Sequence, residues 1–281
     1  RGVDLAGLVA GLLLTFGLAS QLDAAMSVSV NPSVPSPSPV GTQVTWSAGV
    51  SGAGTGTLWY RFRSRPVGAD YRMIRDFGPV STLDWAVIGQ EGAYEIELAV
   101  RNRDTGETAF TTAQYVLTSR VPDGSPVIST TANPLVFLYS APACPDGAQM
   151  IVEFTAADGK AQHTPAKPCG ANLSMNFYLA GLRANSQYAV KHTIQSGSTS
   201  VDGPVLSLTT PNVSLNTPSY TVAQPPRQSA AEGFLLQTTI LNYQMVLATD
   251  LSGNLVWYYP GAISTLTRTA PGGYFFGVYQ D

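Results

Sequence analysis

Residues Tyr94–Arg101 read YEIELAVR, an alternation of apolar and charged side chains. In a β-strand, the tyrosine, isoleucine, leucine and valine at alternate positions would share one face, and the two glutamates and the arginine would share the other. A period of two is typical of a half-buried strand in an antiparallel sheet. We therefore expect one face of this strand to lie in a core and the other in water.

Similar short runs lie on both sides of this strand, each bounded by Gly, Pro, Asn or Asp. One set comprises 43–50, 58–63, 71–77, 83–88, 94–102 and 109–118, and a second comprises 127–131, 135–140, 149–155, 172–179, 187–195 and 205–210. Runs at this spacing predict β-sandwiches. The Pro- and Gly-rich segment 121–126 separates the sets, so we predict one sandwich over 26–120 and a second over 127–211.

The composition also indicates an all-β fold and excludes several functions. Of the 281 residues, 27 are Gly and 20 are Pro, and only 12% are charged. The formal net charge of -3 makes nucleic acid a poor partner, because binding to phosphates requires an excess of positive charge. Two histidines and two cysteines leave little material for a metal cluster or a histidine-dependent active site. We assign no catalytic residue, no cofactor-binding residue and no metal ligand.

The N-terminus has the features of an export signal. Residues 5–19 read LAGLVAGLLLTFGLA, a run without charge that is short for a membrane span of about 20 residues and typical of a signal peptide. We assign 1–25 to a signal peptide and expect export to the periplasm or the extracellular space. A buried strand or helix and an uncleaved signal anchor are the alternatives. Because no Met opens the chain, we expect the sequence to be cut at its start.

The only cysteines, Cys144 and Cys169, each lie in a Pro- and Gly-rich turn. Asp158-Gly159 falls near their midpoint, so a hairpin that turns there would bring both thiols to its open end. A disulfide is the natural interpretation in an exported protein, and it would stabilise the domain by roughly 3 kcal/mol. The alternative is two separate buried thiols.

Two short motifs resemble known sandwich families. Residues 182–190 have the form L-x-A-x-x-x-Y-x-V, which resembles fibronectin type III modules, where a leucine precedes by six residues a tyrosine whose hydroxyl bonds back to the preceding corner. Leu182 and Tyr188 are these two residues. Gly92–Ile96 resembles the corresponding corner of an immunoglobulin or PKD-type module, with Tyr94 as the tyrosine. The resemblances imply an immunoglobulin/PKD-like sandwich followed by a fibronectin III-like sandwich.

The C-terminal part has a different pattern. Its composition predicts a linker over 212–231, and 232–281 then contains runs at 234–240, 244–249, 255–259, 265–269 and 274–279. Four or five strands in about 45 residues match one propeller blade. Asp250, Gly253 and Trp257 form a D-x-x-G-x-x-x-W motif, and a Pro-Gly-Gly turn follows at 271–273. This pattern resembles the opening blade of the bacterial arylsulfotransferase family.

The resemblance implies an exported aryl-sulfate sulfotransferase, which transfers a sulfuryl group from a phenolic sulfate ester to a phenol through a covalent histidine intermediate. That family's catalytic histidine and arginine residues come from later blades, so none is carried over to this chain. We expect a truncated, non-catalytic N-terminal fragment. The resemblance implies an enzyme only for the whole family protein, because the catalytic blades are expected to lie outside this chain.

The expected partners are the remainder of its own propeller and a second copy of the chain or a cell-surface partner, with phenolic sulfates bound only by the full-length protein. The alternative function is a cell-surface adhesion or carbohydrate-binding protein made of β-sandwich modules.

One further cluster could bind a ligand. Its arginines are Arg61, Arg63, Arg65, Arg72 and Arg75, interleaved with Trp59, Tyr60, Phe62 and Tyr71. Such a stripe could hold an anionic sugar or a sulfated ligand. The simpler interpretation is the solvated face of one strand, because three of the arginines alternate and Asp70, Asp76 and Asp84 are available to balance them. Of the two histidines, His192 is in phase with a core-facing set and His163 lies in a polar hairpin arm.

Overall fold

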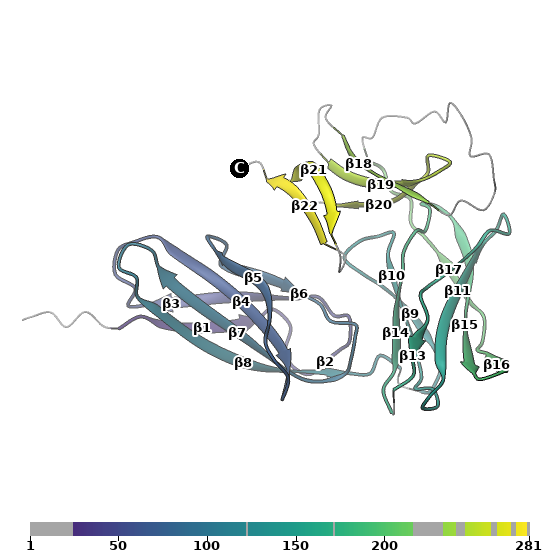
Figure 1. The fold of residues 1–281 in the computed structure, drawn as a ribbon, viewed down its shortest axis with the longest axis horizontal. Coiled ribbons are helices and arrows are strands. Elements are labelled where there is room, and N and C mark those ends of the chain that lie inside the picture. Colours follow the sequence, from purple (N-terminus) through teal and green to yellow (C-terminus); the bar gives the residue numbers. More distant parts are fainter. Residues whose placement is uncertain are drawn as a thin grey trace, which may run out of the picture.

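The computed structural model describes residues 25–121, 123–170, 172–215, 233–239, 245–259, 263–270 and 274–279. Every element in this part of the chain is a β-strand, which confirms the all-β prediction (Figure 1). Accordingly, none of the described segments is a helix long and apolar enough to cross a membrane. The predicted signal peptide, apart from residue 25, and the linker from residue 216 onward lie outside the described residues.

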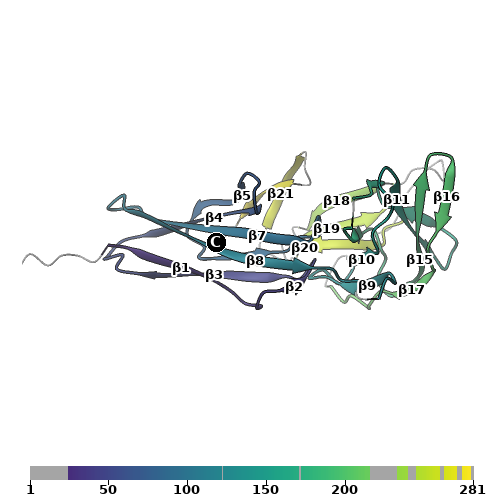
Figure 2. The same ribbon diagram turned by 90° about the horizontal axis from the view of Figure 1, so that it is seen from below.

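The first sandwich consists of two sheets that face each other as layers (Figure 2). One sheet has the order β1-β3-β6, with β1 at Ser27–Pro32, β3 at Val44–Ser51 and β6 at Thr82–Trp85. The other has the order β2-β8-β7-β4-β5, with β2 at Ser38–Pro39, β8 at Thr108–Thr118, β7 at Gly92–Asn102, β4 at Leu58–Pro66 and β5 at Arg72–Gly78. Neighbours are antiparallel except β2, which pairs with β8 in parallel.

Aromatic rings fill the core between these two sheets. Trp46 of β3 contacts Trp85 and Tyr115 edge to face, with ring centroids 6.3 and 5.5 Å apart, and Trp85 makes the same kind of contact with Tyr94. Edge-to-face packing places the positive edge of one ring against the negative face of the next. The four rings join the two layers, because Trp46 and Trp85 come from one sheet and the tyrosines from the other.

Both buried tyrosines of this core find partners for their hydroxyl groups. The Tyr94 hydroxyl donates to the carbonyl oxygen of Gln90, 2.9 Å away, so it bonds back to the corner that precedes β7. The Tyr115 hydroxyl lies 3.1 Å from the carbonyl oxygen of Val34 and 2.9 Å from Ser38 Oγ. It thereby fixes the proline-rich segment between β1 and β2 along the edges of the two sheets, where the absence of proline N–H groups is tolerated.

The prediction that the polar face of β7 would lie in water is wrong at its centre. Glu97 is only 7% exposed and Ala99 only 1%. Because β7 is an inner strand, the arginines of its neighbour β4 cover this face. Alternation correctly identified which side chains face the core, but it did not reveal what covers the opposite face.

The second sandwich has its own hydrophobic core, formed around Tyr139, Met150 and Phe177. One sheet has the order β14-β10-β9, with β14 at Met175–Leu179, β10 at Phe137–Ala141 and β9 at Val127–Thr130. The other has the order β12-β11-β15-β16, with β12 at Ala161–His163, β11 at Gln149–Ala156, β15 at Gln187–Ser196 and β16 at Thr199–Asp202. Two short strands lie beside this path: β13 at Lys167–Pro168 pairs with β11, and β17 at Leu206–Thr209 pairs with β15. This is a fibronectin III/immunoglobulin-like sandwich.

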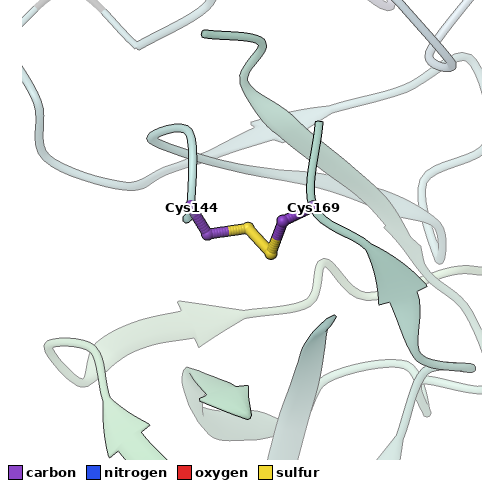
Figure 3. The surroundings of a disulfide bond; sticks show 2 residues. All are labelled: Cys144 and Cys169. Atoms are coloured by element: carbon purple, nitrogen blue, oxygen red, sulfur yellow. A yellow bond between two sulfur atoms is a disulfide. The ribbon is translucent and has the colours of Figure 1, made fainter. Parts of the chain in front are cut away.

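The predicted disulfide is confirmed (Figure 3). Cys144 and Cys169 are bonded, with their Cα atoms 5.4 Å apart. As expected, the chain between them is a hairpin that turns at Gly159, where φ is +81°. The N–H of Cys169 donates to the carbonyl oxygen of Ala148, so the second cysteine lies at the open end of this hairpin.

The C-terminal strands form two separate sheets in the described residues. β18 (Phe234–Thr239), β19 (Met245–Asp250) and β20 (Leu255–Tyr259) make an antiparallel meander, and β21 (Ile263–Ala270) pairs with β22 (Tyr274–Tyr279). β21 returns to lie near β18 and β19 (Figure 1). Together these sheets do not show the single blade of four or five strands that the sequence predicts.

Replacing both cysteines, Cys144→Ser and Cys169→Ser, should lower the free energy of unfolding of the second sandwich by about 3 kcal/mol, because the unfolded chain gains the freedom of a loop that spans 25 residues. Hydrogen exchange of the β10 and β15 amides during urea unfolding would measure this. Exchange of the β7 amides supplies the internal control, since β7 belongs to the first sandwich, whose core is separate. Unchanged amide protection in the second sandwich would contradict the prediction.

His192 should make the stability of the second sandwich depend on pH. Burial lowers the pKa of its imidazole from the usual value of about 6.5, so the unfolded state binds more protons as the pH falls below that value. The free energy of unfolding should therefore decrease from pH 7 to pH 5. His192→Phe should flatten this dependence. Equal slopes in the unmodified chain and the variant, measured by hydrogen exchange, would show that His192 is not responsible.

Candidate functional site

The outer face of β4 and β7 carries a group of ion-paired arginines and glutamates. Because side chains alternate along β4, Arg61, Arg63 and Arg65 share its outer face, while Phe62 points into the core. The antiparallel register with β7 places Arg63 opposite Glu97 and Arg65 opposite Glu95. Cross-strand pairing thus brings opposite charges together, as in other antiparallel sheets.

The glutamates of β7 are the partners of these arginines. Arg63 holds Glu97 in a bidentate pair, with its Nε 2.7 Å and its Nη2 2.6 Å from the two carboxylate oxygens. Arg65 binds Glu95 through Nε and Nη2, and its hydrogen bond is the main cause that lowers the pKa of the Glu95 carboxyl. Arg61 approaches Glu97 only to 3.5 Å.

The prediction that Asp70, Asp76 and Asp84 balance the arginines is wrong. Within the described residues, the ion pairs of the three β4 arginines go to Glu95 and Glu97. Asp84 instead accepts a hydrogen bond from the Thr45 hydroxyl, and Asp76 accepts one from the backbone N–H of Phe77. The balancing carboxylates come from β7. The positions of the arginines and aspartates along the chain could not indicate this, because it depends on how β4 and β7 pair.

Aromatic rings stack with the guanidinium groups on this face. Each of three rings has an arginine Cζ within about 5 Å of its centroid: Phe77 has Arg61 and Arg101, Tyr71 has Arg63 and Arg65, and Trp59 has Arg103. We call these eight residues, together with Glu95 and Glu97, the arginine ladder. Stacking of a cation on a ring face is attractive and fixes the guanidinium plane.

Sequence reasoning found part of the ladder and missed the rest. Arg72 is exposed on the edge strand, and Arg75 donates to the carbonyl oxygen of Thr82, so neither belongs to it. Phe77, Arg101 and Arg103 belong to it but were not in the predicted cluster. Only the pairing of β4 with β7 brings Arg101 beside this stripe, opposite Trp59.

The second feature is the corner that Leu182 and Tyr188 form. Leu182 is fully buried, and the Tyr188 hydroxyl accepts a hydrogen bond of 2.9 Å from the backbone N–H of Arg183. The corner therefore fixes the backbone of Arg183, whose side chain points away from the second core. Its guanidinium lies 3.0 Å from Asp158 of the same sandwich and 2.8 Å from Asp250 of the C-terminal sheet.

Asp250 organises the turn between β19 and β20. Its Oδ1 accepts hydrogen bonds of 2.9 Å from the N–H groups of Ser252 and Asn254, and Gly253 takes the left-handed conformation with φ +84°. An aspartate at the start and a glycine inside are what such a turn requires. Burial alone would raise the pKa of the Asp250 carboxyl, but hydrogen bonds from Asn254 and Arg183 lower it overall. Trp257 follows on β20, with its ring 6.4 Å from that of Tyr259.

A second polar contact joins the C-terminal sheet to the second sandwich. The side-chain amide of Asn133 donates to the carbonyl oxygen of Tyr258 over 2.8 Å. Together with the ion pair between Arg183 and Asp250, it ties β19 and β20 to the loops of the sandwich. The D-x-x-G motif thus lies in a turn that the preceding module holds.

The remaining candidates offer little chemistry. A hydrogen bond of 2.5 Å joins His192 Nδ1 to the Tyr139 hydroxyl inside the second core, and burial raises the pKa of that tyrosine. His163 is exposed. A shallow hollow between β11, β15 and β17, around Ala156 and Leu206, has no charged residue in its lining. Among the described residues, no three His, Cys, Asp or Glu side chains gather closely enough to hold a metal ion.

Neither a protein-family model nor a curated protein matches the sequence. Among solved structures, the chain is similar to the FN1–FN3 domains of chicken CNTN1, with 13% identity, 68% of each chain covered and a TM-score of 0.27. It is also similar to a segment of two fibronectin type III domains from chicken tenascin, with 16% identity, 65% of this chain and 98% of that chain covered and a TM-score of 0.28. At these TM-scores, we base the fold on the strand orders described above.

Arg183→Ala should loosen the C-terminal sheet. The change removes the cation that holds Asp250, so amides of β19 and β20 should exchange faster by about three- to tenfold, as for a partly exposed ion pair with its hydrogen bond. Hydrogen exchange of the full chain measures this. Asp158→Asn is the matched control, because it removes the other partner of Arg183 and leaves the contact with Asp250 in place. If both variants accelerate exchange equally, the contact with Asp250 does not hold the sheet.

Proposed function

We propose that this chain is the non-catalytic N-terminal portion of an exported, arylsulfotransferase-like protein, in which two sandwiches position the start of a β-propeller. The observation that carries the proposal is the turn at Asp250. The aspartate and glycine of the D-x-x-G motif order this turn, and Arg183 of the second sandwich binds its carboxylate. A module that positions a propeller needs such a fixed attachment to its first strands.

The path of the C-terminal strands supports the same proposal. In a propeller, the chain leaves the outer strand of one blade and returns to the centre to begin the next. Here β18, β19 and β20 form a meander, after which β21 comes back beside β18 and β19. On this proposal the first three strands belong to one blade, and β21 and β22 begin the next.

The role of the sandwiches would be positioning rather than chemistry. Sulfuryl transfer requires a nucleophile together with cationic or proton-donating groups that neutralise the sulfate oxygens and the leaving phenolate. His192 is buried against Tyr139 in the second sandwich, whereas the β4 arginines lie in the first sandwich. The histidine and these arginines therefore do not form one site. Transfer from phenolic sulfates is therefore proposed only for the full-length protein. The disulfide between Cys144 and Cys169 fits an oxidising, exported location.

The second candidate function is that of a cell-surface adhesion or carbohydrate-binding protein. It is favoured by the two sandwiches, each with a core of its own, and by the exposed Arg101 and Arg103 of the arginine ladder. In that case the C-terminal strands would belong to a further binding module.

The coding sequence that follows the codon for Asp281 distinguishes the two candidates. The first predicts at least four further blade-like repeats and a histidine that faces the propeller channel, whereas further sandwich repeats would support adhesion. The chain itself should transfer no sulfuryl group from 4-nitrophenyl sulfate to a phenol. Turnover above that of a heat-denatured control would contradict the non-catalytic assignment.

A further inference from the structure

We propose that the arginine ladder of the first sandwich binds an anionic polysaccharide through Arg61, Arg101 and Arg103. This inference is compatible with either candidate function, because it concerns only the outer face of β4 and β7. Its test measures binding, so it can fail independently of the assignment to an arylsulfotransferase-like protein.

The ladder carries more positive charge than its own carboxylates neutralise. It contains five guanidinium groups and two carboxylates. The shortest ion pairs, those of Arg63 and Arg65, occupy both glutamates. The adjacent Asp76 and Asp104 direct carboxylate oxygens to the backbone N–H groups of Phe77 and Thr57. The net charge of the whole chain is -3, so the positive charge of the ladder is a local feature of this face.

Arg61, Arg101 and Arg103 retain free donors. Arg101 and Arg103 are exposed, and neither guanidinium has an ion pair or a hydrogen bond within the described residues. Arg61 makes only a long contact of 3.5 Å from its Nη2 to Glu97. The Nε of Arg61 is buried without a hydrogen-bond partner in the described part of the chain, so only the Nη groups of Arg61 can reach a ligand. An arginine fork with unsatisfied N–H groups is suited to bind an oxyanion.

The rings beneath these arginines hold them in place. Arg101 lies 4.2 Å from the centroid of Phe77, and Arg103 lies 4.2 Å from that of Trp59. Stacking restricts the guanidinium plane while its edge remains open to solvent. Because stacking already restricts these arginine side chains in the free protein, an anion that binds them causes a smaller loss of conformational entropy.

The surroundings favour a polysaccharide. Across the sheet, the register aligns Arg61 with Ala99 and Ala99 with Phe110, whose side chain is 74% exposed. A ring this exposed on the same face as these arginines can pack against the apolar face of a sugar, while the sulfate or carboxylate groups of that sugar meet the guanidinium groups. A long nucleic acid fits less well, because its dense phosphates would be repelled by the net negative charge of the rest of the chain.

Isothermal titration of the full chain with heparin fragments, at low and at physiological salt, tests the proposal. We expect binding that weakens as salt increases, and Arg101→Gln combined with Arg103→Gln should weaken it by about tenfold, the effect of two exposed charge contacts. Both side chains are exposed, so the variant should keep its fold, which circular dichroism would verify. Hyaluronan, which carries carboxylates but no sulfates, shows which anion the site accepts.

The matched control is Arg72→Gln combined with Lys160→Gln, which removes the same charge from exposed positions outside the ladder. It should bind heparin as the unmodified chain does. The proposal is overturned if neither polysaccharide binds, if the control weakens binding as much as the ladder variant, or if duplex DNA of equal charge binds as tightly as heparin.

Discussion

The hydroxyl group of a buried tyrosine must find a hydrogen-bond partner, and this requirement fixes the corner of each sandwich. A hydroxyl left without a partner in a core costs about 1–3 kcal/mol, so the chain at the corner has little choice of path. Tyr94 meets the requirement at the carbonyl oxygen of Gln90, and Tyr188 meets it at the N–H of Arg183. In the second sandwich, the same bond fixes the residue that reaches Asp250. The attachment of the C-terminal sheet therefore depends on a packing constraint inside the core before it.

A similar constraint governs the outer face of the first sandwich. Glu97 is nearly as buried as the core residues, and a buried carboxylate is stable only when it is paired and hydrogen-bonded. Arg63 supplies both bonds, and this leaves Arg61 with a single long contact to the same carboxylate. The unsatisfied donors of Arg61 thus follow from the geometry that satisfies Glu97. The Glu97 carboxylate cannot bind both guanidinium groups equally closely. The pair with Arg63 that stabilises Glu97 therefore leaves Arg61 on the same face with donors for a ligand.

The sequence was sufficient for features that depend on local order and insufficient for those that depend on register. Alternation along 94–101 predicts the core-facing residues of β7, and the position of Gly159 between the cysteines predicts the hairpin that joins them. The burial of Glu97 and the contact of Arg101 with Phe77 could not be predicted, because they depend on how β4 and β5 pair with distant segments. The strand Thr199–Asp202 also has no apolar pattern, since all four of its residues are exposed.

The two features with functional interest rest on different cores. The arginine ladder covers the outer face of the sheet whose inner face packs on Trp46 and Trp85, whereas Arg183 extends from the core around Tyr139 and Phe177. These cores share no residue, and no hydrogen bond or ion pair in the described chain connects the ladder to Arg183. Interactions without common partners contribute nearly additively to stability. A ligand on the first sandwich would therefore leave the attachment of the C-terminal sheet unchanged, and the two proposed roles do not depend on each other.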